Sequence, residues 1–261
     1  MAYSRSSRRT LKSRKTYGRG TKPYRRAVYR RAYFNRRRGI GRKEKKGCDV
    51  GFASASISSS TATNDSMFLL NGVQEGVGSW NRIGRYLWNK SIELDLNFRW
   101  QSAFTALDAS QVNAQWLRCI VVWDKQPNNS TIPTWDTIFG NTSQTGAETS
   151  SVNDHLRYDN MFRFKVLHDA MINPSMTGAN PGSVPSSTTS GGLSQQTYVR
   201  YHKYLKLGNK MTNFSGTANP VTNANISTGS LYLILRQFVS NAPDESWYIL
   251  DSSHCRLRYV D

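Results

Sequence analysis

The chain has 261 residues, of which 35 are Lys or Arg and 17 are Asp or Glu, so its formal net charge is +18. No stretch approaches the roughly 18–20 consecutive apolar residues of a membrane-spanning helix, and the cationic start has no apolar segment behind it that would make it a secretory signal. The three cysteines are scattered and odd in number, which argues against a disulfide framework and favours a reducing compartment.

Residues 1–46 carry all of the excess charge. They hold 19 of the 35 basic residues and a single acid, Glu44, so residues 47–261 keep 16 basic and 16 acidic residues and are neutral. A segment with such dense like charge and few aliphatic residues is expected to be disordered when it is alone in water. We therefore divide the chain into a basic N-terminal arm, residues 1–46, and a globular domain, residues 47–261.

The residue types of the arm suit nucleic acid. Arginine binds phosphate through two parallel hydrogen bonds and stacks on bases, and the interleaved tyrosines can stack on unpaired bases at about 1–3 kcal/mol each. A tail that only keeps the protein soluble would not explain why aromatics and acid depletion coincide with the charge. The predicted nucleic-acid-binding residues are Arg5, Arg8, Arg9, Lys12, Arg14, Lys15, Arg19, Lys22, Arg25, Arg26, Arg30, Arg31, Arg36, Arg37, Arg38, Arg42, Tyr17, Tyr24, Tyr29 and Tyr33.

The same basic runs have a second implication. Runs of this density also act as nuclear import signals, which predicts host import receptors as partners and a nuclear phase. Binding to an anionic membrane is less favoured, because the arm has no amphipathic apolar stripe.

The first half of the domain contains the clearest strand in the chain. Short strands are expected near residues 49–57 and 67–70, and Asn71-Gly72 then gives a turn signal. Over residues 87–100 apolar and polar side chains alternate, which predicts a strand with one buried face. The buried set is Ile92, Leu94, Leu96, Phe98 and Trp100, and the opposite set is Glu93, Asp95, Asn97 and Arg99.

The next predicted elements are a strand, a short helix and a loop. Residues 115–123 are almost uniformly apolar and predict a buried strand, which the turn-forming residues 124–129 end. Residues 135–139 predict a short helix, and residues 140–153 a polar loop.

The remaining predicted strands are 161–167, 198–207, 228–239 and 247–260, the last broken near Asp251. Residues 173–197 hold almost no apolar side chain and predict a long surface segment without secondary structure. About eight antiparallel strands with unequal loops predict an all-β fold, a single eight-stranded antiparallel jelly roll made of two sheets, with the arm outside it. A lipocalin-like barrel is less favoured because its loops are short and regular, and an immunoglobulin-like sandwich lacks its cysteine–tryptophan–cysteine pattern here.

Residue types that carry catalysis or bind metal are sparse. None of the four histidines, His155, His168, His202 and His254, lies at metal-ligand spacing from another histidine or a cysteine, and no catalytic motif occurs. His254 and Cys255 are adjacent, so a strand would point them to opposite faces. Asp124 and Asp136 are explained more simply as a turn acid and a helix-start acid than as paired carboxylates. The sequence predicts no enzyme activity, no cofactor and no metal.

Several segments occur in an order and spacing that resemble a known family. They are Asn71–Gly76, Arg82–Arg85, Lys90–Leu94, Leu117–Asn128 and the stretch from Pro133 to Ile138. Together with the arginine-rich arm they resemble the coat proteins of small circular single-stranded DNA viruses that encode a rolling-circle replication initiator, in a geminivirus-like or related unclassified group. The resemblance spans essentially the whole chain, and each single motif is short.

The resemblance implies one jelly roll, assembly of identical copies into an icosahedral shell, an interior arm that packages circular single-stranded DNA, and a nuclear phase in the host cell. The cysteine and histidine pattern proposed to bind zinc in some geminivirus coat proteins is not matched. Two alternatives remain: a cellular RNA-binding protein with a basic tail, and a viral movement or nuclear-shuttle protein that forms no closed shell. The globular domain carries no base-stacking motif of the common RNA-binding modules, which weighs against the first.

Overall fold

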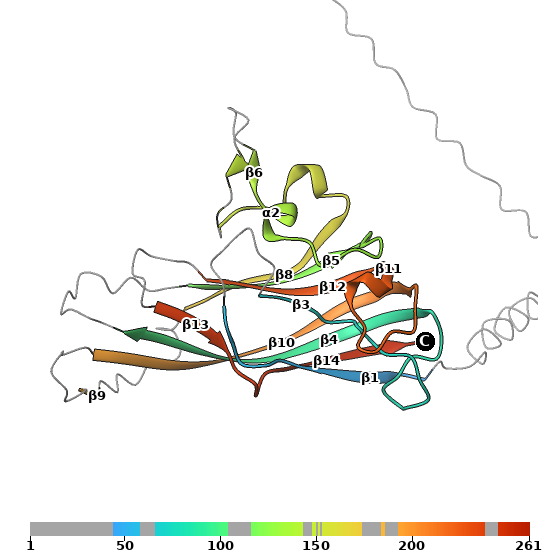
Figure 1. Cartoon of the computed structure of the whole chain (residues 1–261), viewed down its shortest axis with the longest axis horizontal. Coiled ribbons are helices and arrows are strands. Elements are labelled where there is room, and N and C mark those ends of the chain that lie inside the picture. Colours follow the sequence, from blue (N-terminus) through green and yellow to red (C-terminus); the bar gives the residue numbers. More distant parts are fainter. Residues whose placement is uncertain are drawn as a thin grey trace, which may run out of the picture. The chain divides into compact units, whose positions relative to one another are not determined.

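The structure is a computed structural model that divides into two compact units, Met1–Lys43 and Glu44–Asp261. It describes parts of the second unit, namely residues 44–57, 66–103, 116–142, 148–149, 151, 153–173, 184–185, 193–237 and 245–261. These residues form an all-β sandwich of two antiparallel sheets (Figure 1). Within these ranges, no helix has both the length and the apolar character needed to cross a bilayer.

The larger sheet has β4 at its centre. The order is β1 (Lys46–Gly51), β14 (His254–Val260), β4 (Tyr86–Ala103), β10 (Leu193–Phe214) and β11 (Ile226–Thr228). The short strands β2 (Ala55–Ser56), β13 (Glu245–Ile249) and β9 (Val184–Pro185) extend it. Because β14 and β13 pair with successive stretches of the same edge of β4, the turn between them is the predicted break near Asp251.

The smaller sheet has four strands in the order β3 (Met67–Leu69), β12 (Ser230–Gln237), β5 (Leu117–Asp124) and β8 (Phe164–Ile172). The segment between β5 and β8 contains the helix α2 (Trp135–Ile138), the ribbon of β6 (Asn141–Thr142) and β7 (Glu148–Thr149), and the 3-10 turn η2 (Tyr158–Asn160). This segment lies on the side of the smaller sheet that faces away from the larger one (Figure 1).

The main core fills the space between the sheets, and β4 shows how the sequence specifies it. Its five predicted inward side chains, Ile92 to Trp100 in alternation, are all buried, whereas the alternate residues are partly exposed. Cys255 is likewise buried and its neighbour His254 exposed. The predicted faces of these two strands are therefore confirmed.

A second, smaller core explains why β5 has no exposed face. All eight residues of β5 are buried. Leu117, Cys119 and Val121 face the main core, whereas Ile120 and Val122 pack with Trp135 and its neighbours on the outer side of the sheet. The predicted helix near residue 135 is confirmed, and it supplies the cover under which Ile120 and Val122 are buried between the charged residues Arg118 and Asp124.

Three predictions about segments need correction. Residues 193–197, predicted to lack structure, belong to β10 and pair with the end of β4, because ladder hydrogen bonds need no apolar alternation. The 140–153 loop contains the β6–β7 ribbon. The strand predicted from residue 161 begins at Phe164, after η2 and a turn. The other parts of 173–197 and 140–153 fall partly outside the described residues.

The crossing from β11 to β12 carries the chain from the larger sheet to the smaller one. It passes through Gly229, whose φ is +79°, and a Cβ there would lie 2.2 Å from the carbonyl oxygen of Met211. The fully buried Asn71 side chain braces the same crossing, because its amide donates to the carbonyl of Gly229 at 2.8 Å and its oxygen accepts from the amide of Leu231 at 2.9 Å. The turn-forming dipeptide Asn71-Gly72 thus links the two sheets.

Candidate functional site

The predicted nucleic-acid-binding residues, Arg5 to Arg42 with the four tyrosines, lie outside the described residues. What the structure describes is the point where the arm joins the domain. Lys46, assigned to the end of the arm from the sequence, is the first residue of β1 and is buried. Its ammonium pairs with Asp261 at 3.0 Å and donates to the carbonyl of Asn81 at 3.1 Å. Lys46 is therefore part of the folded domain, and its charge is already compensated.

Asp261 receives a second bond at this corner, from the amide of Ile83 at 2.7 Å. Partial burial alone would raise the pKa of Asp261, but the Ile83 amide and the Lys46 ammonium together hold it below its ordinary value. The root of the arm is thus fastened to the loop before β4 by an ionised carboxylate.

The outer face of the larger sheet carries rows of charged side chains that cross the strands. In one row the register places Asp49, Arg256, Glu93 and Tyr204 side by side on β1, β14, β4 and β10. In the next row Asp95 of β4 lies between His254 and His202. The acidic column of β4 is therefore flanked by basic columns on both sides.

These charges compensate one another in pairs. Arg256 donates to Asp49 at 2.7 and 2.8 Å, and Arg200 donates to Asp95 at 2.8 and 2.6 Å. Glu93 accepts from Arg258 at 2.9 Å and contacts His202 at 3.2 Å. Hydrogen bonds from Arg256, His202 and Arg200 hold the pKa values of Asp49, Glu93 and Asp95, respectively, below their ordinary range. Each of these three carboxylates on the outer face is thus paired with a basic side chain.

A shallow hollow of about 370 Å³ opens on this face beside Tyr198 and Ser252. Among the described residues that line it, Arg200 is the charged one, and its guanidinium is held by Asp95.

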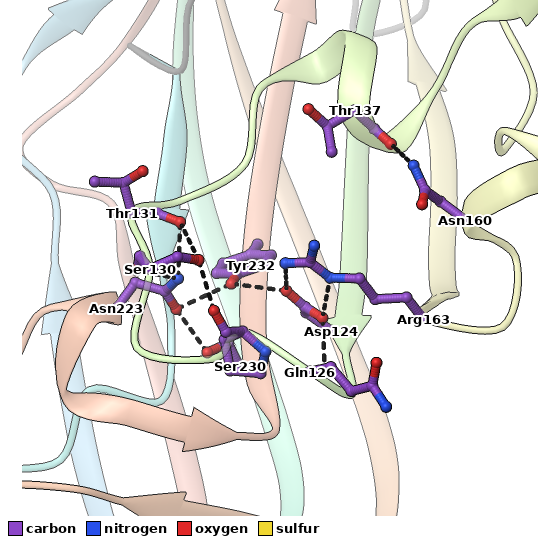
Figure 2. Close-up of polar contacts among 11 residues, drawn as sticks. Asp124, Gln126, Ser130, Thr131, Thr137, Asn160, Arg163, Asn223, Ser230 and Tyr232 are labelled. Carbon is purple, nitrogen blue, oxygen red and sulfur yellow. Dashed lines mark hydrogen bonds and ion pairs between the residues drawn. The ribbon is translucent and has the colours of Figure 1, made fainter.

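A buried polar network lies at the end of β5, where the chain leaves the smaller sheet (Figure 2). The fully buried Asp124 accepts two bonds from Arg163, at 3.0 and 2.8 Å, and one from the amide of Gln126 at 2.9 Å. Tyr232 donates to Asn223 at 2.9 Å and to Asp124 at 3.3 Å. Burial, followed by the charge of Asp124, raises the pKa of Tyr232 above its ordinary value.

Asn223 continues this network toward the loop after β5. Its amide donates to the carbonyls of Ser130 and Thr131, at 2.9 and 3.1 Å, and its oxygen accepts from Ser230 at 2.6 Å. Every polar atom named in this network has a partner. The network therefore holds the loop after β5 and the turn around Asn223 against the smaller sheet. The bond from Gln126 also agrees with the interpretation of Asp124 as a turn acid.

The remaining groups of interest from the sequence are dispersed. Cys48, Cys119 and Cys255 are free thiols, and burial raises the pKa of Cys119 to about 12. His155, His202 and His254 are exposed, and His168 contacts the hydroxyl of Tyr201. Among the described residues, no group of three His, Cys, Asp or Glu side chains could hold a metal ion.

Comparison with known proteins gave no match, either to a protein-family model or to a curated protein. The structure adds one feature that the sequence analysis did not assign. The glycine-containing segment between β3 and β4 exposes Trp80 and other large apolar side chains while burying Arg82. Its only signal in the sequence was the set of glycines around Trp80 and Arg82.

Proposed function

We propose that this chain is the coat protein of a small circular single-stranded DNA virus. In this proposal the sandwich is a jelly roll that assembles with identical copies into an icosahedral shell, and the basic arm takes up the phosphate charge of the packaged DNA. The segments quoted in the sequence analysis suggest the family, and the domain and its charge distribution support the role.

The order of the strands carries the proposal. Eight strands make up the core of the two sheets when β2, β9 and β11, which extend the larger sheet, and β13, which shares an edge of β4 with β14, are set aside. We number these eight strands one to eight along the chain. Across the larger sheet β1, β14, β4 and β10 are then strands 1, 8, 3 and 6, and across the smaller sheet β3, β12, β5 and β8 are strands 2, 7, 4 and 5. The chain changes sheet at every step except that from β5 to β8. Two interleaved Greek keys of this kind make a jelly roll, an architecture that capsid domains use.

The distribution of charge supports the same role. The domain holds 16 basic and 16 acidic residues, and its described surface pairs on the larger sheet are mutually compensated. Neutral domains can approach one another without long-range repulsion. The net excess of +18 is confined to residues 1–46, and apart from Lys46, which pairs with Asp261, we assign it to polyanion binding.

Electron microscopy with negative stain, together with size-exclusion chromatography, tests the shell. The full-length chain should elute as a megadalton species and show closed particles of uniform diameter. A monomer or dimer under all conditions that favour assembly would instead favour a nucleic-acid-binding or nuclear-shuttle protein.

A salt titration tests the arm. On single-stranded DNA each neutralised phosphate contributes about −0.7 to the slope of log K against log salt, so half of the arm's cations would give roughly −6. Replacing Arg36, Arg37 and Arg38 by Ala should make the slope less negative by about 2. Sequence preference should be weak, because stacking on tyrosine tolerates every base.

The matched control removes three arginines from the domain: Arg200, Arg256 and Arg258, each replaced by Ala. Because carboxylates already pair with them, the salt slope should stay unchanged. If this triple variant, and not the arm variant, lost the slope, the binding site would lie on the larger sheet.

A further inference from the structure

Residues 76–86, here called the apolar loop, lead into β4 and expose four large apolar side chains. Val77 is fully exposed, Ile83 and Trp80 are largely exposed, and Tyr86 is about half exposed. Single exposed apolar residues are normal on a protein surface, but four within ten residues mark a contact surface.

The backbone of the apolar loop is closed on itself. The amide of Arg82 donates to the carbonyl of Gln74 at 2.9 Å, and the amide of Gly76 donates back to the carbonyl of Arg82 at 3.1 Å. A Cβ at Gly76 would lie 2.3 Å from the side-chain nitrogen of Asn81, so the Asn81 side chain packs directly against the backbone of Gly76. Val77 and Trp80 lie between these closing contacts.

A buried arginine fixes the loop from below. Arg82 is fully buried, pairs with Glu75 at 2.8 Å, and donates to the carbonyls of Val73 at 3.2 Å and Gly216 at 2.6 Å. Its guanidinium also lies 4.2 Å from the ring centre of Phe214. A buried charge with this many partners holds one geometry. The apolar side chains are therefore positioned before any partner arrives, which lowers the entropy cost of binding.

Three further bonds tie the loop to the larger sheet. The hydroxyl of Tyr259 donates to the carbonyl of Trp80 at 2.7 Å. Lys46 donates to the carbonyl of Asn81, and the amide of Ile83 donates to Asp261. The loop thus moves with β1 and β14 as one surface.

A second exposed apolar cluster, here called the apolar turn, comprises residues 158–162. Tyr158 and Phe162 are largely exposed and Met161 is partly so. The side chain of Asn160 donates to the carbonyl of Thr137 at 2.6 Å (Figure 2), and Lys125 donates to the carbonyl of Phe162 at 2.7 Å. These bonds hold the turn to the segment that covers the smaller sheet, on the opposite layer from the apolar loop.

The chemistry of the apolar loop selects a protein as its partner. Trp80 and Tyr86 could stack on bases, but the two most exposed side chains of the loop, Val77 and Ile83, are aliphatic and could not. The charge of Arg82 is already paired with Glu75. The domain is neutral, so a second copy can approach without repulsion. We propose that the apolar loop of one copy packs against the apolar turn of a neighbouring copy. This inference rests on the proposed shell and names one of its contacts.

The contact is head-to-tail, since different surfaces of the two copies meet, and such contacts generate rings or shells when they close. Burying the four aromatic side chains of the contact, Trp80, Tyr86, Tyr158 and Phe162, would remove roughly 400–600 Å² of their surface from water, judged from the area that buried aromatics cover. A stable pair needs about 1,000 Å² or more. Each copy would make this contact twice, once through its loop and once through its turn, so the contact should hold copies together only alongside other interfaces of the shell.

A double-mutant cycle on the full-length chain tests the inference. The readout is the critical concentration for particle formation, followed by light scattering. Trp80→Ala and Phe162→Ala should each raise it at least about fivefold, as expected for anchors of an interface. The double variant should raise it by less than the product of the single effects, because the two side chains would share one contact. Tyr198→Ala is the matched control: Tyr198 is 62% exposed and Trp80 61%, and its loss should leave the concentration unchanged.

The outcomes separate the two proposals. If wild type forms no particles, the proposed shell is wrong. If wild type assembles but the two single effects multiply fully in the double variant, or Tyr198→Ala is as harmful as Trp80→Ala, the assigned contact is wrong. The thermal midpoint of each unassembled variant should match that of wild type, because the truncated side chains are exposed.

Discussion

Two arginine–aspartate pairs of the same geometry stand on the two sheets in opposite surroundings. Arg163 binds Asp124 at 3.0 and 2.8 Å on the smaller sheet, and Arg200 binds Asp95 at 2.8 and 2.6 Å on the larger one. The side chain of Asp124 is 0% exposed, whereas that of Asp95 is 15% exposed beside a guanidinium that is 69% exposed. The Arg163–Asp124 pair is therefore a buried structural ion pair, whereas the Arg200–Asp95 pair is a surface ion pair.

The difference arises because the outer face of the smaller sheet is covered by other residues, whereas the charged side chains on the outer face of the larger sheet are exposed. The smaller sheet is covered by the segment between β5 and β8, so polar groups beneath it must find partners inside the protein. The charged side chains on the outer face of the larger sheet pair with one another and remain partly exposed to solvent. The covered face holds its shape through polar bonds, and the open face contributes little to stability while keeping its charge compensated.

The largest effect is expected where both sheets meet. Leu94 is fully buried in the main core, so Leu94→Asp would place an unpaired carboxylate there at a cost of several kcal/mol against a total stability of about 5–15 kcal/mol. The variant should fail to fold, as circular dichroism and a thermal melt would reveal. Glu93→Gln, its neighbour on the open face, is the control and should melt as wild type does. A folded Leu94→Asp protein would contradict the assignment of the faces of β4.

The next largest effect compares the two pairs directly. Asp124→Ala leaves the Gln126 amide without its acceptor and takes the carboxylate from Arg163, whereas the Tyr232 hydroxyl keeps its bond to Asn223. Because Arg163 is partly open to water, the loss should be about 3 kcal/mol. Asp95→Ala leaves a guanidinium that water can solvate, so the melt should change little. Urea denaturation of both variants measures the difference. Equal losses would mean that burial does not separate the two pairs.

The two strands that carry these pairs were not equally predictable from sequence. In β4 the alternation of side chains assigned each residue to a face, and each assignment held. In β5 the uniform apolar run predicted a buried strand, but a single strand cannot reveal what covers its second face. That cover comes from Trp135 and its neighbours, which the sequence placed in a helix without a packing partner.

Contacts between distant residues were out of reach for a similar reason. Asp124 and Arg163 are 39 positions apart, and their pairing depends on the start of β8, which was predicted three residues too early. Residues 193–197 extend β10 through backbone bonds to β4, so their polar side chains gave no periodic signal. The exposed apolar loop depends on the burial of Arg82, which no local pattern predicts.

Acid should weaken the open face. The pKa values of Asp49, Glu93 and Asp95 lie below their ordinary values of 3.8, 4.5 and 3.8. A lowered pKa means that the folded state binds fewer protons than the unfolded state, so the stability from these groups is present above pH 4.5 and is lost as the pH falls through the folded values. Melting midpoints from pH 6 to 2.5 measure this loss.

Salt provides the check on that acid effect. The pairs are exposed, so salt near 0.5 M should screen them and flatten the decline. The double variant Arg200→Ala and Arg256→Ala, which removes two of the partners, should flatten it as well. A decline that neither change reduces would have to come from carboxylates elsewhere in the chain.

The smallest effect concerns the only described histidine that joins the two sheets. His168 of β8 contacts the hydroxyl of Tyr201 of β10, and burial, followed by the nearby Lys203, holds its pKa below the ordinary 6.5, although Asp169 opposes this. The folded state therefore disfavours the protonated ring, and stability should decline as the pH falls below 6.5, well before the carboxylates of the open face titrate. His168→Gln should remove this shallow decline between pH 7 and 5, whereas His155→Gln, which replaces an exposed ring outside the sandwich, should leave it in place. If His168→Gln kept the decline, the contact between β8 and β10 would not be sensitive to protonation, and pH would act on the two sheets only through their outer faces.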